Sequence, residues 1–183
     1  MILAPQKIPT LFGIPITRDT EQDIIDTAQA DGWIWAGRGE FSIVFVRGTQ
    51  ALKLFSDPAY FEFLTQIVTP DNEAFPKIIE GPYLGYDLSA VIVERLEPLS
   101  ENDYWLSSQI ADLADEAQYL GNLDVDSDEA YALSVHISND GVDALSLIIG
   151  LAHAFGLGTD LQPQNLMRRP KTGQLVFSDP LKI

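Results

Sequence analysis

Residues 33–55 read WIWAGRGEFSIVFVRGTQALKLF, and this segment predicts the first part of an antiparallel sheet. Three β-rich runs, 33–36, 42–46 and 51–55, alternate with the turn segments 37–40 and 47–50, a pattern that predicts consecutive hairpins of an antiparallel sheet. Because glycine has no side chain, the Gly37-Arg38-Gly39 turn would let backbone N–H groups approach phosphate oxygens closely. Two glycines are also common in ordinary hairpin tips, so the turn alone does not specify a ligand.

The sequence on either side of residues 33–55 predicts an N-terminal arm, two helices and a further hairpin. Residues 1–18 are rich in proline and predict an irregular arm, followed by a short helix over 19–30. Pro58 stands where it would begin a helix over 59–68. The runs 75–80 and 89–94 predict a further hairpin that turns at 81–85.

After Pro98 the apolar residues follow a helical period. They predict a helix over 104–120 and a buried helix over 142–155, followed by a loop over 159–169 and a strand over 174–177. The fold class expected is therefore α+β, with the pivot at 95–98. We expect an arm and short helix in 1–32, a β-rich lobe with one helix in 33–96, and a helical lobe in 97–183.

Composition restricts the chemistry of this 183-residue chain. It contains no cysteine and two histidines, which excludes thiol catalysis and a multi-histidine zinc site. No apolar run reaches the roughly 18 residues of a membrane span, and the start lacks a signal-peptide pattern, so we expect a cytoplasmic protein. The formal net charge of −16 is the wrong sign for general nucleic-acid binding, and it favours either solubility alone or a basic protein partner.

Four polar residues could form a nucleotide site. Lys53 stands among apolar residues on the strand after the glycine turn, where it faces either a ligand or solvent. Asp160 and Asn165 lie five residues apart after the buried helix, and Asp179 follows an apolar strand. Aspartate can accept a proton from a hydroxyl, and carboxylate and amide oxygens bind Mg²⁺. Ordinary turn-capping roles would explain Asp160 and Asp179 equally well one at a time.

The order of these elements resembles the protein-kinase superfamily. Gly37-x-Gly39-x-Phe41-Ser42-x-Val44 is similar to the glycine-rich loop, and Ala51-Leu52-Lys53 is similar to V-A-I-K. Residues 160–165, DLQPQN, resemble the end of H-R-D-L-K-P-E-N, and Asp179 stands where D-F-G would be. The resemblance covers about residues 33–181. In its compactness the chain looks most like the early serine/threonine kinases of tailed bacteriophages.

The resemblance implies a bilobal kinase-like fold with an antiparallel N-lobe, a truncated helical C-lobe, and ATP and Mg²⁺ as cofactors. Asp160 would be the catalytic base, and Lys53 would pair with the α- and β-phosphates. Asn165 and Asp179 would hold Mg²⁺, and Glu62, with Glu73 as the alternative, would form an ion pair with Lys53. The remaining nucleotide contacts would come from Gly37, Gly39, Phe41, Ser42, Val44, Glu94 and Leu96.

The chain also departs from the family pattern. Gly158 and Thr159 replace the His-Arg pair, and Gln162 replaces a lysine that steadies the γ-phosphate. Arg168, Arg169 or Lys171 could supply that charge. The sequence given ends at Ile183, and it contains no activation segment and no A-P-E motif.

Two functions from different classes follow. The first is a minimal serine/threonine protein kinase that acts on host proteins in the host cytoplasm and phosphorylates itself, with Ser42 as a candidate site. The alternative is a pseudokinase-like module that inhibits a host partner through acidic clusters at 112–116 and 124–129. A small-molecule kinase of the aminoglycoside type ranks last, because little chain follows Pro98 for its substrate pocket. Neither function involves nucleic acid or a membrane.

Overall fold

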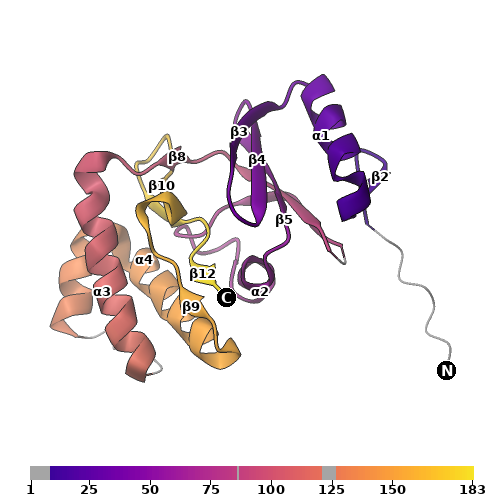
Figure 1. The fold of residues 1–183 in the computed structure, drawn as a ribbon. Helices are drawn as coiled ribbons and strands as arrows, with labels where there is room; N and C mark the ends of the chain where they lie inside the picture. Colours follow the sequence, from indigo (N-terminus) through magenta and orange to yellow (C-terminus); the bar gives the residue numbers. More distant parts are fainter. Residues whose placement is uncertain (1–8, 86, 121–126) are drawn as a thin grey trace, which may run out of the picture. The chain divides into compact units, whose positions relative to one another are not determined.

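The computed structural model describes residues 9–85, 87–120 and 127–183 (Figure 1). The chain divides into two compact units, each of which is described by itself below. Unit 1 comprises residues 1–57 and 78–95, and unit 2 comprises residues 58–77 and 96–183. The division differs from the expected one in two places, because residues 9–32 join the sheet and residues 58–77 join the helices.

Unit 1 is built on a five-stranded antiparallel sheet with strand order β3-β4-β5-β7-β6. Its strands are β3 (Ile34–Arg38), β4 (Ser42–Arg47), β5 (Gln50–Phe55), β6 (Ile78–Leu84) and β7 (Ser89–Glu94). The expected strands are confirmed, with corrections at the ends of two of them. Strand β3 includes Gly37 and Arg38, which were expected in the turn. Strand β6 begins at Ile78 rather than at residue 75, and it continues through residues 81–84 of the expected turn while it pairs with β7 across two register shifts.

One face of this sheet is covered by the N-terminal segment. Helix α1 (Glu21–Ala30) buries Ile24, Ile25 and Ala28, which belong to one apolar cluster with Phe45 and Leu52 of the sheet (Figure 1). Strand residues alternate between the two faces, so the residues between these buried ones point to the opposite face. The helix therefore leaves the second face of the sheet for other contacts.

The described part of the expected arm has regular structure. The short strands β1 (Thr10–Leu11) and β2 (Ile14–Pro15) form a hairpin, and the 3-10 helix η1 (Arg18–Thr20) leads into α1. Leu11 and Ile16 are buried in the same apolar cluster as α1. Residues 1–8 of the arm lie outside the described residues.

Unit 2 contains the helices α2 (Pro58–Gln66), α3 (Tyr104–Leu120) and α4 (Asp128–Phe155), with the 3-10 helix η2 (Glu101–Asp103) before α3. The expected helix over 104–120 is confirmed, and α4 begins well before the expected residue 142. Ser127 caps its start by accepting a hydrogen bond from the Ala130 amide, and Gly156 ends it at a φ of 66°. Ser138, at φ 68°, interrupts the helical backbone and kinks α4. Residues 124 and 126 of the expected acidic cluster lie outside the described residues.

Short strands complete unit 2. β8 (Glu97–Pro98), β10 (Leu166–Arg168) and β11 (Leu175–Phe177) form one antiparallel sheet, and β9 (Gly158–Thr159) pairs with β12 (Leu181–Lys182). The prediction of a loop over 159–169 was therefore incomplete, because this segment contains β10 and the 3-10 helix η3 (Pro163–Asn165). The protein is thus α+β, with antiparallel sheets and a helical part. No helix in the described part of the chain is long and apolar enough to cross a membrane.

Candidate functional site

A row of four residues crosses the unit 1 sheet on the face opposite α1. Gly37 of β3 pairs with Val44 of β4, Val44 pairs with Lys53 of β5, and Lys53 pairs with Val91 of β7. Directly paired residues of neighbouring strands share a face and lie about 5 Å apart, so Gly37 and Lys53 are separated by about 10 Å. Three residues selected from the sequence, Gly37, Val44 and Lys53, are therefore held side by side on one surface.

The glycine turn closes tightly beside this row. The Gly39 amide donates a hydrogen bond to the Ser42 carbonyl at 2.8 Å, which places Glu40 and Phe41 at the exposed tip. A Cβ on Gly39 would lie 3.2 Å from the Ser42 hydroxyl, whereas a Cβ on Gly37 would meet nothing within 4 Å. Packing therefore does not explain Gly37, and its bare backbone leaves open space above the Lys53 face.

Lys53 is half-buried rather than an exposed strand residue. Its neighbours Leu52 and Leu54 are fully buried on the α1 side, so alternation directs Lys53 to the opposite face. In the same register Glu94 ends β7 opposite Gln50, and the Arg95 amide donates to the Thr49 carbonyl at 2.8 Å. The chain passes from unit 1 to unit 2 directly after this bond, between Arg95 and Leu96.

In unit 2, Asp160 and Asn165 are joined by their side chains. The Asn165 Nδ2 donates to the Asp160 carboxylate Oδ2 at 2.8 Å and to the Asp160 backbone carbonyl at 3.0 Å. The buried Ser107 hydroxyl donates to the Leu161 carbonyl at 2.6 Å and fixes the same loop to α3. Because the amide nitrogen is anchored in this way, the Asn165 amide oxygen is the end left to act as a ligand.

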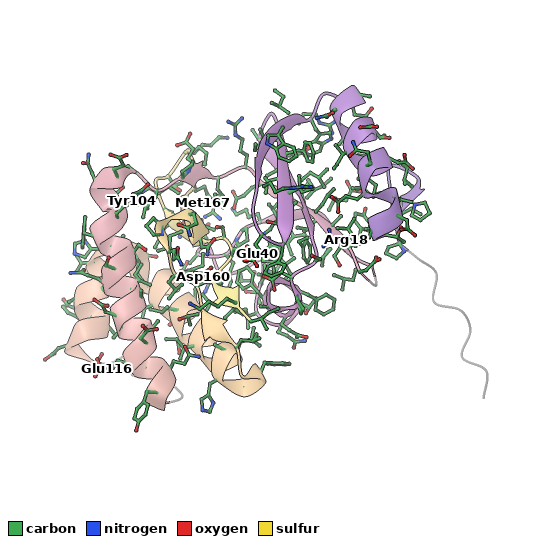
Figure 2. The ribbon with its side chains drawn as sticks, viewed as in Figure 1. Arg18, Glu40, Tyr104, Glu116, Asp160 and Met167 are labelled. Carbon is green, nitrogen blue, oxygen red and sulfur yellow. The ribbon has the colours of Figure 1, made fainter. Side chains whose placement is uncertain are left out.

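Asp179 is brought to the same loop by backbone pairing. The Asp160 amide donates to the Pro180 carbonyl at 2.7 Å, and the Ser178 amide donates to the Asn165 carbonyl at 2.9 Å. These bonds flank Asp179 on both sides, and Leu181 pairs with Thr159 one residue beyond. Asp160, Asn165 and Asp179 therefore form one local cluster, although 14 residues separate the last two in sequence. Figure 2 labels Asp160 on this loop.

The electrostatics of this cluster favour a cation. The Asp160 Oδ1 atom is buried and accepts no hydrogen bond from the residues that the structure describes. Burial raises the pKa of Tyr60 well above its usual value, and the nearby Asp179 carboxylate raises it further. A buried carboxylate oxygen is unfavourable unless a donor or a cation neutralises it, and Mg²⁺ is bound by oxygen ligands of this kind.

The donor set fits Mg²⁺ bound together with a nucleotide rather than a closed protein site. Within residues 9–85, 87–120 and 127–183, no group of three or more carboxylate, histidine or cysteine side chains could hold a metal. Mg²⁺ usually keeps several waters and takes one or two carboxylates together with substrate phosphates. The Asp179 carboxylate and the Asn165 amide oxygen match that pattern, and the Asp160 carboxylate lies beside Asn165.

The candidate ion-pair glutamates and the candidate γ-phosphate cations all belong to unit 2. Glu62 is half-buried on α2 in unit 2, and its pairing with Lys53 in unit 1 stays a prediction. Glu73 is instead tied to Arg169, whose guanidinium donates to the Glu73 carbonyl at 2.8 Å. Arg168 lies 3.3 Å from Asp103. Arg168 and Arg169 therefore form contacts within unit 2. Of the three candidate cations for the γ-phosphate, Lys171 alone forms no side-chain hydrogen bond or ion pair with the residues that the structure describes.

Sequence reasoning missed a cavity at the end of the unit 1 sheet. It has a volume of about 230 Å³ and is lined by Arg18, Glu21, Arg38, Gly39, Glu40, Phe41, Ser42, Ile43, Leu54 and Leu88. Glu21 lies 2.7 Å from Arg18 and 3.2 Å from Arg38, so one carboxylate bridges the two guanidinium groups. Figure 2 labels Arg18 and Glu40 in this unit. No motif contained Arg18 or Glu21, and only the fold brings them to the glycine turn.

No family model matches the chain, and no curated protein matches it. Among solved structures, the chain is similar to a crystal structure of a kinase domain, with 16% identity and a TM-score of 0.31. The match covers 82% of this chain and 48% of that one, so the chain spans about half the length of the kinase domain.

Proposed function

We propose that the protein is an ATP- and Mg²⁺-dependent phosphotransferase of the protein-kinase type. In this proposal unit 1 is the nucleotide-binding N-lobe and unit 2 is the helical C-lobe of a bilobal kinase-like fold. The observation that carries the proposal is the cluster in unit 2, where Asn165 holds the Asp160 carboxylate at 2.8 Å and leaves one buried carboxylate oxygen without a hydrogen-bond donor from the described residues. Turn-capping alone would not leave a buried carboxylate oxygen in that state.

The residues have distinct roles in this chemistry. Asp160 would accept the proton of the acceptor hydroxyl as its oxygen attacks the γ-phosphorus and the bond to the β–γ bridging oxygen breaks, releasing ADP. Asn165 and Asp179 would hold Mg²⁺, which supplies positive charge to the phosphate oxygens when bound. Lys53 would pair with the α- and β-phosphates, and the backbone at Gly37 would approach them closely.

A nucleotide site in this protein needs nearby cations, because the net charge of the chain repels phosphate groups. The chain has a net charge of −16, so a nucleotide approaches against repulsion. Two unit charges 4 Å apart interact by about 1 kcal/mol in bulk water and by about 4 kcal/mol at an effective dielectric of 20. The half-buried position of Lys53 is therefore the kind of setting in which one ammonium can offset that repulsion.

Transfer of labelled phosphate from ATP in the presence of Mg²⁺ tests the proposal. Asp160→Asn should lower transfer by about 10²-fold or more, since a positioned base contributes roughly 10²–10⁴ to such reactions. Lys53→Met should also abolish most transfer. Asp143→Asn removes an exposed carboxylate of α4 and is the matched control, which should retain full activity. Equal labelling by all four proteins would refute the proposal.

The proposed acceptors follow from the resemblance to serine/threonine kinases. We propose serine or threonine hydroxyls of a host protein, together with the protein's own Ser42, which lines the cavity beside Arg18 and Arg38. Mass spectrometry after prolonged incubation with ATP and Mg²⁺ should find phosphate on Ser42 in the wild type and none in Asp160→Asn. Phosphate on Ser42 in both proteins would show that another enzyme transfers it.

One observation favours a second candidate, a binding module without catalysis. Gln162 occupies the position of the family's phosphate-steadying lysine, and its amide oxygen accepts a hydrogen bond from Gln164 at 2.6 Å. The position therefore contributes no positive charge to the cluster. Under this alternative the wild type and Asp160→Asn would inhibit the partner equally well, and neither protein would transfer phosphate.

A further inference from the structure

The negative charge of the protein is concentrated in one part of the chain. Residues 96–167 contain no lysine or arginine, yet they hold 13 of the 27 acidic residues. The remaining residues have 14 acidic and 11 basic side chains, so they are nearly balanced. This stretch includes α3 and α4 of unit 2.

The same two helices expose large apolar side chains. Trp105 on α3 is 46% exposed, and Tyr131 and Val135 on α4 are 73% and 74% exposed. Tyr131 and Val135 are one helical turn apart and therefore lie on the same side of α4. The Trp105 ring meets the His136 ring edge-on, with centroids 5.0 Å apart, so the exposed sides of the two helices are continuous.

Folding does not require these exposed side chains. The inward sides of the helices are already filled by buried residues, which are Leu106, Ile110, Ala114 and Ala117 of α3 and Ala130, Leu133 and Ile137 of α4. An amphipathic helix normally presents polar residues on its outer side. Aromatic and aliphatic residues at those positions, next to each other on two helices, are typical of a protein interaction surface.

Exposed carboxylates lie on the same two helices. Asp112, Asp115 and Glu116 are exposed along α3, and Asp128 is exposed at the start of α4. Figure 2 shows Tyr104 and Glu116 towards opposite ends of α3. Within the described residues none of these four carboxylates forms a salt bridge with a cation. Their charge is therefore available to a partner.

We propose that the face formed by Trp105, Tyr131, Val135 and His136, with the exposed carboxylates of the same two helices, binds an arginine-rich surface of another protein. Guanidinium groups pair with carboxylates and also stack on aromatic rings, so one residue type satisfies both features of the face. A second copy of this chain would meet its own negative charge, and nucleic acid would be repelled by it. The inference is independent of the phosphotransfer proposal.

Fluorescence anisotropy of a labelled peptide that alternates arginine with leucine tests this face on the full chain. We expect binding that weakens as salt is raised, and loss of binding when the peptide carries glutamate in place of arginine. The variant Asp112→Asn/Asp115→Asn/Glu116→Gln should weaken binding about tenfold. Tyr131→Ser/Val135→Ser should weaken it by a similar factor, while circular dichroism shows that the helices remain folded.

A control with the same change in net charge distinguishes this face from general attraction. Asp19→Asn/Asp23→Asn/Asp31→Asn removes three exposed carboxylates of unit 1 and should change affinity less than about twofold. Equal weakening by the two triple variants would overturn the proposal, as would full affinity in Tyr131→Ser/Val135→Ser. Asp160→Asn should bind the peptide normally, so loss of phosphotransfer and loss of docking are separable.

Discussion

Arg169 offers the most quantitative test of how unit 2 is held together. Its side chain is buried, with 7% exposure, and its guanidinium donates hydrogen bonds within unit 2. The acceptors include the Glu73 carbonyl at 2.8 Å, the Gln174 side-chain oxygen at 2.9 Å and the Phe75 carbonyl at 3.2 Å. Ala74, between two of these acceptors, accepts a hydrogen bond from the Phe177 amide at 2.9 Å. Arg169 therefore supports the strand that leads to Asp179.

Replacing Arg169 by methionine removes these donors, including the donor to the buried Phe75 carbonyl. A hydrogen bond from a charged group contributes about 1.5–3 kcal/mol, and each buried acceptor left unsatisfied costs about 1–3 kcal/mol. Because these contributions overlap, we expect the free energy of unfolding to fall by about 3–5 kcal/mol. At 2–4 °C per kcal/mol for a chain of this size, the Tm should fall by roughly 6–20 °C.

Urea denaturation followed by circular dichroism measures this loss. Arg168→Met is the matched control, because the neighbouring arginine forms a partly exposed pair with Asp103 and should contribute less than about 1 kcal/mol. Arg169→Lys should recover only part of the loss, since an ammonium cannot reproduce the planar set of donors. Equal destabilisation by Arg168→Met and Arg169→Met would refute the reasoning.

Two further predictions concern packing and pH. Gly141→Ala should destabilise the protein by about 1–3 kcal/mol, because the new Cβ would lie 2.9 Å from the Ile137 side chain. Gly150→Ala should instead stabilise it by about 0.5–1 kcal/mol, because a Cβ there meets nothing within 4 Å. Thermal unfolding of both variants checks that the two effects have opposite signs. Burial and Asp179 raise the pKa of folded Tyr60, so the folded state retains this proton above pH 10 while the unfolded state loses it. Stability should therefore fall as pH rises above about 10, and Tyr60→Phe should lose less stability over that range in urea titrations at stepped pH. Identical pH profiles for wild type and Tyr60→Phe would contradict this sign.

The sequence predicted elements whose signal is local. β7 (Ser89–Glu94) and α3 (Tyr104–Leu120) match their expected bounds, because a continuous β-rich run and a regular apolar period determine them. Strand β6 was missed in part, since Gly81-Pro82 reads as a turn while its pairing with β7 continues through it. Strand β10 (Leu166–Arg168) has three residues and depends on partners far away in sequence, β8 and β11, which no local pattern reports.

The site residues also fall into two groups, those that the sequence predicts and those whose contacts only the fold shows. Gly37, Val44 and Lys53 were selected from motif order, and strand register accounts for their common face. The link from Asn165 to Asp160 spans five residues and follows from a short loop. Arg169 was considered only as a source of charge for phosphate, because its acceptors Glu73 and Phe75 lie 96 and 94 residues away. Long-range hydrogen bonds of this kind become visible only in the fold.

The proposed function requires that the Asp160 cluster of unit 2 binds a metal ion together with a nucleotide. NMR of the labelled protein with ATP and Mn²⁺ in place of Mg²⁺ tests this directly, because the paramagnetic ion broadens the signals of nearby nuclei. The amides around Asp160 and Asp179 should broaden when ATP is present and stay sharp with Mn²⁺ alone. Sharp signals from these amides in the presence of ATP, or equal broadening without ATP, would contradict the proposed function.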